Sequence, residues 1–360
     1  ESFRTMASST MVPGLFLSCL LLLTCGQASA SRLTAAAKTA RFVLDDAAQL
    51  PELLQFNASD RPLIGIYTQD SPSDYAGIPG TNAEYIAASY AKLVEGSGAR
   101  PVAVSYNLAQ NDLLALLDAL DGFIFPGGGQ DLSLDKTYAT NALHILNYAQ
   151  DRIGFPVVGI CLGFELLSVI TAQQGDVLSS FDAQNLLDKP SWEYQAYLNS
   201  KLSQFYPPYS VMQAYQVFEN HRSGVSLDTY QSTLSGFFSL LATSLDRNND
   251  TYVSAMEARD YPIFGFQFHP EKNTYEWAAT EVIPHDYWDL EVTRGVSNLL
   301  AYYSRKGSST RRRRQVSASD VNAMLIYNVP AVFTAPYSDQ SSFEQIYFFP
   351  KGYKPRAQAS

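Results

Sequence analysis

The chain has 360 residues, which is enough for one large domain or two smaller ones. Hydrophobic residues make up 46% of it, as in ordinary globular proteins, and this excludes a largely disordered chain. Because the formal net charge is -10, we expect no nucleic-acid partner.

Residues 1–30 have the pattern of a secretory signal peptide. An apolar run from Val12 to about Cys25 precedes Ala-Ser-Ala at 28–30, which fits a cleavage site. The run is too short to span a membrane comfortably, and no later segment approaches that length. We therefore expect a cleaved leader, no membrane span after its removal, and a destination outside the cell or in the lysosome or vacuole. Asn57 and Asn249 begin glycosylation sequons, which have meaning only in that pathway.

The cysteines point to one reactive thiol. Of the three in the chain, Cys19 and Cys25 lie in the apolar leader, so its removal leaves only Cys161. No intramolecular disulfide is then available. An unpaired cysteine on a tight turn is more typical of a nucleophile than of a packing residue.

Short apolar runs alternate with stretches of helical spacing in the first half of the chain. We expect strands at residues 63–67, 101–104, 122–125 and 157–160, and helices at residues 83–96, 113–120 and 142–151. Strands that alternate with helices indicate an α/β fold with a parallel sheet covered on both faces. Ligands of such sheets bind beyond the carboxyl ends of the strands.

The second half continues this pattern less regularly. Further strands are expected at residues 237–243, 252–256 and 263–268, a helix at 292–303, and a closing pair of strands at 323–327 and 345–349. The run Arg311–Arg314 indicates an exposed charged loop or a protease-processing site. We divide the chain into the signal peptide, a leader segment at 31–60, a single domain at 61–350 and a tail at 351–360.

Residues 155–167 indicate a nucleophile elbow. An apolar strand leads into Gly-x-Cys-x-Gly and then into the first turn of a helix, and the glycines leave room for backbone and substrate. The turn places Cys161 at a helix N-terminus, where the helix dipole favours the thiolate.

A cysteine nucleophile needs a base and a group that orients the base. Of the chain's four histidines, His269 is the best candidate, because it ends an apolar strand and Pro270 turns the chain there. Glu271 could bond the other ring nitrogen and fix the tautomer. The alternative is a satisfied core or surface histidine.

The glycines of residues 126–129, Pro-Gly-Gly-Gly, allow two interpretations. One is a tight turn. The other is an oxyanion hole, in which the Gly128 N–H joins the N–H of Leu162. A phosphate loop is excluded because the Gly-Lys-Ser/Thr ending is missing.

Gly-Ile-Cys161-Leu-Gly, Phe-Pro-Gly-Gly-Gly before it and Phe-His269-Pro-Glu271-Lys after it resemble the class I glutamine amidotransferase-like superfamily. Tyr-Ile-Ala-Ala-Ser-Tyr at 85–90, Phe-Glu after the elbow and Tyr-Glu-Trp at 275–277 narrow the resemblance to the gamma-glutamyl hydrolase (folate hydrolase) family. It covers roughly residues 60–350. The resemblance implies a three-layer sandwich with a central, mainly parallel sheet, flavodoxin-like with added strands.

By this resemblance, Cys161 attacks the gamma-amide carbonyl of a substrate such as a folyl poly-gamma-glutamate. His269 takes the thiol proton and passes it to the leaving nitrogen, and water hydrolyses the gamma-glutamyl thioester. Glu271 matches the acid of the superfamily triad. The family's chemistry implies no cofactor and no metal.

The same resemblance suggests substrate contacts. Glu165 would meet the alpha-amino group of the gamma-glutamyl unit, and it is also a first-turn helix acid favoured by the dipole. His221 matches a family histidine near the substrate, or is an exposed loop histidine. Arg222 could meet a substrate carboxylate, and Gly127 is placed at the substrate.

Two rival functions stay open at this point. One is a glutaminase that hands ammonia to a synthase, which a secretory leader disfavours. The other is a non-catalytic binding protein that kept the fold, which the joint presence of Cys161, His269 and Glu271 disfavours. The sequence leaves open endo- against exo-cleavage, the preferred head group and the oligomeric state, a homodimer included.

Overall fold

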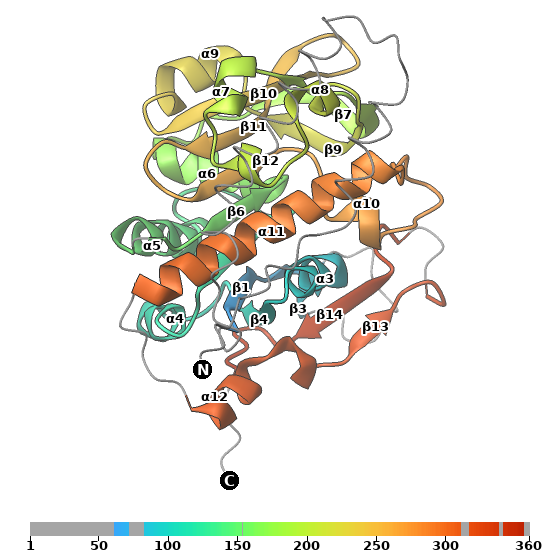
Figure 1. Ribbon diagram of the computed structural model, residues 1–360. Coiled ribbons are helices and arrows are strands. Elements are labelled where there is room, and N and C mark those ends of the chain that lie inside the picture. The colour runs from blue at the N-terminus through green and yellow to red at the C-terminus, as the bar shows by residue number, and fades with distance from the viewer. Residues whose placement is uncertain (1–60, 72–82, 153, 311–316, 338–340, 356–360) are drawn as a thin grey trace, which may run out of the picture. The chain divides into compact units, whose positions relative to one another are not determined.

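The computed structural model describes residues 61–71, 83–152, 154–310, 317–337 and 341–355 (Figure 1). These residues belong to one unit that spans residues 58–360. The predicted signal peptide, the leader segment, Asn57 and the run Arg311–Arg314 lie outside the described residues.

The main sheet has eight strands within the described ranges. In sheet order they are β4 (Arg100–Val104), β1 (Leu63–Tyr67), β5 (Gly122–Phe125), β6 (Val157–Ile160), β12 (Ile263–Phe266), β11 (Thr251–Ala258), β10 (Phe238–Leu245) and β8 (Ser191–Trp192). The pairs from β4 to β12 are parallel, and those from β12 to β8 are antiparallel. The prediction of a mainly parallel sheet with added strands is confirmed.

Strand β1 shows why its segment reads as a continuous apolar run. Leu63 and Tyr67 project into one hydrophobic cluster, and Ile64 and Ile66 project into the other. Side chains alternate across a strand, so a strand with helices on both faces needs apolar residues at every position. The sheet therefore separates two cores, as a three-layer sandwich requires.

Helices cover both faces. The first core contains apolar residues of α4 (Gln110–Leu117), α5 (Thr137–Asp151) and α6 (Leu162–Ala172). The second contains residues of α3 (Ala88–Gly96) and α11 (Tyr287–Thr310), which pack against each other (Figure 1). In α11, the buried residues Val292, Val296 and Leu299 recur at helical spacing and form one apolar stripe.

Two smaller sheets lie in the described part of the chain. One has the order β13 (Ala331–Phe333), β14 (Gln345–Phe349), β3 (Glu84–Ala87), β2 (Gln69–Asp70), and the other pairs β7 (Ser179–Asp188) with β9 (Val217–Gly224). All their pairs are antiparallel. The remaining elements are α7 (Tyr194–Leu198), η2 (Leu202–Gln204), α8 (Tyr209–Met212), α9 (Leu227–Thr229), η3 (Tyr230–Leu234), α10 (Lys272–Tyr275), α12 (Ala318–Met324) and η4 (Ile326–Asn328).

Two predicted elements are wrong. The helix expected at 83–96 starts only at Ala88, because Glu84–Ala87 forms β3 between β14 and β2. The strand expected at 323–327 is the end of α12 followed by η4, and β14 pairs instead with β13. The first error concerns a strand whose partner β14 lies far away in the sequence, and local periodicity does not record such a pairing.

Two observations bear on the predicted secretory route. Asn249 is exposed in the turn between β10 and β11, where its φ is 65°. In the described ranges, no helix is both long enough and apolar enough to cross a membrane.

Candidate active site

Cys161 occupies a sharp turn between β6 and α6. Its φ of 50° and ψ of -108° are rare for a residue with a side chain, as at nucleophile elbows. Its N–H donates to Phe266 O at 2.8 Å, and its carbonyl accepts from Glu165 N at 3.0 Å. These two backbone bonds hold the turn against β12 and the first turn of α6.

The elbow glycines let two backbones approach closely, as expected. A β-carbon at Gly159 would lie 2.5 Å from Gly163 O, and one at Gly163 would lie 1.9 Å from Phe125 O. A side chain at either position would therefore push α6 away from β5 and β6, and the cysteine with it.

His269 and Glu271 are paired. His269 Nδ1 lies 2.8 Å from Glu271 Oε1, and the Glu271 side chain is fully buried. The His269 N–H donates to Phe218 O of β9 at 2.9 Å. A carboxylate on Nδ1 places a proton there and directs Nε2 elsewhere, which is the arrangement a general base needs.

Gly127 brings the cysteine and the histidine together. A β-carbon at Gly127 would lie 2.7 Å from His269 Cε1 and 3.2 Å from Cys161 Cβ. The thiol-bearing carbon and the imidazole edge therefore both lie close to the position that a Gly127 side chain would occupy. This point lies beyond the carboxyl ends of the adjacent strands β5, β6 and β12, where ligands of open α/β sheets bind.

Two side chains fix the glycine loop. Gln69 Nε2 donates to Gly127 O at 2.8 Å, and the Gly127 N–H donates to the Tyr90 hydroxyl at 2.8 Å. A β-carbon at Gly128 would lie 1.8 Å from Gln69 Oε1, so the loop can approach Gln69 only as glycine. In the described part of the chain, the Gly128 N–H has no protein acceptor, as an oxyanion donor requires.

The resting thiol is held protonated. Burial raises the pKa of Cys161 well above its usual range, the Glu165, Glu271 and Glu219 carboxylates raise it further, and only the Leu162 N–H lowers it. The expectation that the helix N-terminus favours the thiolate is therefore wrong in its net direction. The Leu162 N–H at the helix N-terminus favours the thiolate, but desolvation and three acids outweigh it.

Glu165 and His221 belong to a buried polar cluster next to the thiol. Burial raises the pKa of Glu165 to about 7, while His221 and Gln267 oppose the shift. Gln267 Nε2 donates to Glu165 Oε1 at 3.3 Å. His221 Nε2 lies 3.2 Å from Glu219 Oε2, and its Nδ1 lies 2.7 Å from Ser223 O.

His221 is not a loop histidine. It lies in the middle of β9, and its side chain is almost completely buried. Burial lowers the pKa of His221, but Glu219, the Ser223 carbonyl and Glu165 together outweigh this effect and raise the pKa. Arg222, the next residue, points to the opposite face of β9, where it is exposed and donates to Gln184 Oε1 at 2.5 Å.

The family model for peptidase C26 matches residues 62–271, a range that contains Cys161, His269 and Glu271. The chain belongs to the peptidase C26 family. Gamma-glutamyl hydrolase 1 of Arabidopsis thaliana is 34% identical over 305 residues, which cover 81% of this chain and 84% of that protein. Gamma-glutamyl hydrolase B of Dictyostelium discoideum is 31% identical (81% and 84% covered), and gamma-glutamyl hydrolase of Homo sapiens is 30% identical (81% and 91% covered). The predicted family is confirmed.

Four residues of the candidate site are not predicted from the sequence. They are Gln69, Tyr90, Glu219 and Gln267. Two of them could have been found from spacing, because Glu219 and Gln267 each lie two residues before a candidate histidine. Gln69 and Tyr90 carry no such signal, since each acts on a loop about forty or more residues away in the sequence.

Proposed function

We propose that this chain hydrolyses gamma-glutamyl amide bonds, with folyl poly-gamma-glutamates as its substrates. Membership of the peptidase C26 family and the names of its relatives support this activity. The observation that carries the mechanism is that Cys161 Cβ and His269 Cε1 both lie close to the position of a Gly127 β-carbon, with Glu271 on Nδ1 of the histidine.

The first half-reaction forms a thioester. His269 Nε2 takes the proton from Cys161 Sγ as the sulfur attacks the gamma-carbonyl carbon. The N–H groups of Gly128 and Leu162 stabilise the oxyanion. The carbon–nitrogen bond then breaks, the leaving nitrogen takes the proton from His269, and the gamma-glutamyl group stays on the sulfur.

The second half-reaction restores the enzyme. A water molecule gives its proton to His269 and attacks the thioester carbon. The carbon–sulfur bond breaks, the sulfur regains a proton, and a free gamma-carboxylic acid leaves. Since the resting thiol is neutral, its ionisation belongs to the attack step, and Glu271 stabilises the imidazolium that forms.

Glu165 is the proposed partner of the substrate's alpha-ammonium group. Both ring nitrogens of His221 are already engaged by Glu219 and Ser223, so His221 acts through Glu165. When it is protonated, His221 favours the ionised form of Glu165, because its charge opposes the rise in the Glu165 pKa. Gly127 contributes by lacking a side chain where the substrate must approach.

Cleavage of folyl-pentaglutamate by the purified chain, with products resolved over time, tests the activity. We expect Cys161→Ser to lower kcat by at least about 10³-fold. His144→Gln is the matched control, because His144 lies on α5 away from the site and its loss should leave the rate unchanged. Release of ammonia from free glutamine as the preferred reaction would contradict the proposal and identify a glutaminase.

We also propose that the chain enters the secretory pathway. The sequon at Asn249 supports this, since the residue is exposed and lies in a turn. Protein secreted from a eukaryotic host should lose mass on treatment with an N-glycosidase. Asn249→Gln should reduce that loss, and an unmodified Asn249 in secreted protein would contradict this part of the proposal.

A further inference from the structure

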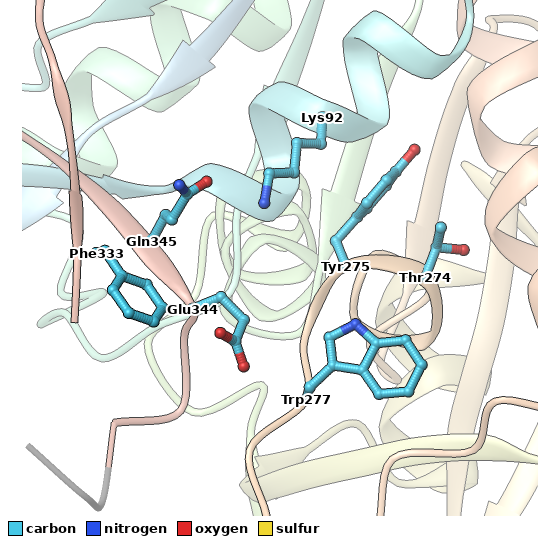
Figure 2. Close-up of a pocket in the computed structure, with 7 residues that line it drawn as sticks. All are labelled: Lys92, Thr274, Tyr275, Trp277, Phe333, Glu344 and Gln345. Atoms are coloured by element: carbon cyan, nitrogen blue, oxygen red, sulfur yellow. The ribbon is translucent and has the colours of Figure 1, made fainter. Parts of the chain in front are cut away.

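A second hollow shares no residue with the cysteine site. It has a volume of about 290 Å³ and lies between α3, α10 and the sheet that contains β13 and β14 (Figure 2). Its walls include Lys92, Trp277, Phe333, Glu344 and Gln345. The volume is close to the lower end of small-molecule pockets, roughly 300–1,000 Å³, so it suits a ligand about the size of one amino acid.

Two opposite charges face this hollow without meeting. Figure 2 shows the Lys92 amine and the Glu344 carboxylate on different sides of the same space. Within the described residues, neither side chain has an ion-pair or side-chain hydrogen-bond partner. Both are partly buried, so each charge has lost water without gaining a protein partner.

A stacking contact supports the tryptophan in the wall of the hollow. The Trp277 ring stacks on the His285 ring at 3.9 Å between centroids and 7° between planes, and His285 Nδ1 lies 2.8 Å from Asn273 O. Nevertheless Trp277 is 62% exposed, and Phe333 is 50% exposed. Large aromatic surface that is held in place and left uncovered is typical of a contact site for a flat apolar group.

The charges decide what kind of ligand fits. Glu344 offsets the positive potential of Lys92, and the whole chain carries a net charge of -10, so a polyanion such as a poly-gamma-glutamate chain is disfavoured. A simple cation would in turn meet Lys92. One positive and one negative group that do not pair with each other complement a zwitterion.

We propose that this hollow binds a free alpha-amino acid with an aromatic side chain. Its carboxylate pairs with Lys92, its ammonium group pairs with Glu344, and its ring lies against Trp277. Each pairing is a charge-assisted contact. The two charged groups of the ligand are the alpha-carboxylate and the alpha-ammonium that every free amino acid carries.

The test measures binding of L-phenylalanine by calorimetry to protein alkylated at Cys161, so that the cysteine site is blocked. L-phenylalaninamide lacks the carboxylate, and N-acetyl-L-phenylalanine lacks the ammonium group. We expect saturable binding of L-phenylalanine, with each analogue weaker by at least about tenfold.

Variants then assign each charge to its partner. Lys92→Met should remove the preference for L-phenylalanine over its amide but keep the preference over the N-acetyl compound, and Glu344→Gln should do the reverse. Trp277→Leu should weaken the binding of all three compounds. Lys189→Met, which removes an exposed lysine elsewhere, is the matched control and should change nothing.

The proposal is overturned by either of two results. One is the absence of saturable binding to the parent protein up to about 10 mM. The other is discrimination between the probes that survives in both charge variants. All the variants should keep parent thermal stability and, without alkylation, parent hydrolase activity. A failure of binding is therefore distinguishable from a failure of the hydrolase assignment.

Discussion

Gly127→Ala perturbs the contact between the candidate nucleophile and its base. A β-carbon there would lie 2.7 Å from His269 Cε1 and 3.2 Å from Cys161 Cβ. Carbon atoms in contact prefer roughly 3.5–4.0 Å, so the imidazole must move by about 1 Å. A displacement of this size at a catalytic group costs about 10²-fold. We therefore expect kcat on folyl-pentaglutamate to fall about 100-fold.

Gly129→Ala is the matched control. It adds the same methyl group two residues along the same loop, where a β-carbon meets no atom within 4 Å. We expect its kcat to equal that of the parent protein. Overpacking at Gly127 should also lower the free energy of unfolding by roughly 1–3 kcal/mol, so rates are compared at a temperature where both variants are folded.

A second readout separates geometry from stability. The rate at which iodoacetamide alkylates Cys161 reports thiol ionisation and access, and it should fall in Gly127→Ala but not in Gly129→Ala. If folded Gly127→Ala protein cleaves the substrate at the parent rate, Cys161 and His269 do not act across this glycine and the reasoning fails.

Three further changes test other parts of the site. Glu271→Gln removes the charge beside His269 Nδ1, and kcat should fall by roughly 10²–10⁴-fold with little change in KM; parent-like kcat would exclude an orienting role. Because burial raises the pKa of Glu165 to about 7, the folded protein holds a proton there that the unfolded chain loses near pH 4.5. The stability that this bound proton contributes is complete below pH 4.5 and is lost as the pH rises through 7. The melting temperature of Glu165→Gln should therefore fall less between these pH values than that of the parent protein. Lys272→Met leaves the buried Glu281 carboxylate without the ammonium group that lies 2.5 Å away, and urea unfolding should show a loss of about 3–5 kcal/mol. Adding Glu281→Leu should recover most of that loss, and no recovery would show that the pair is not the cause.

The sequence is sufficient to predict those parts of the site that depend on residues close together in the chain. The turn at Cys161 can be predicted from the glycines on either side of it, because only glycines permit the close approach of α6 to β5 and β6. His269 and Glu271 lie two residues apart, so their pairing needs no long-range information. The carboxyl ends of β5, β6 and β12 meet because parallel strands bring equivalent ends to one edge.

The sequence is insufficient to predict the burial and charge around a side chain when distant segments of the chain surround it. His221 reads equally well as a loop residue, because its burial depends on β9 lying beside β7 and on the position of Glu219. The prediction for the thiol fails for the same reason. The helix N-terminus at Cys161 is visible locally, whereas the acids that outweigh it come from α6, β9 and the segment after β12.

The acidic residues around Cys161 disfavour the thiolate, yet they are compatible with the proposed mechanism. Each carboxylate makes the thiolate less favourable, so the free enzyme keeps a protonated and unreactive sulfur. Glu165 is also the group assigned to the substrate's ammonium. When that ammonium binds, the charge of Glu165 is neutralised, and one source of repulsion on the forming thiolate disappears. In the proposed mechanism, the gamma-glutamyl group therefore helps to generate the nucleophile that attacks it, and part of its binding energy lowers the barrier to attack.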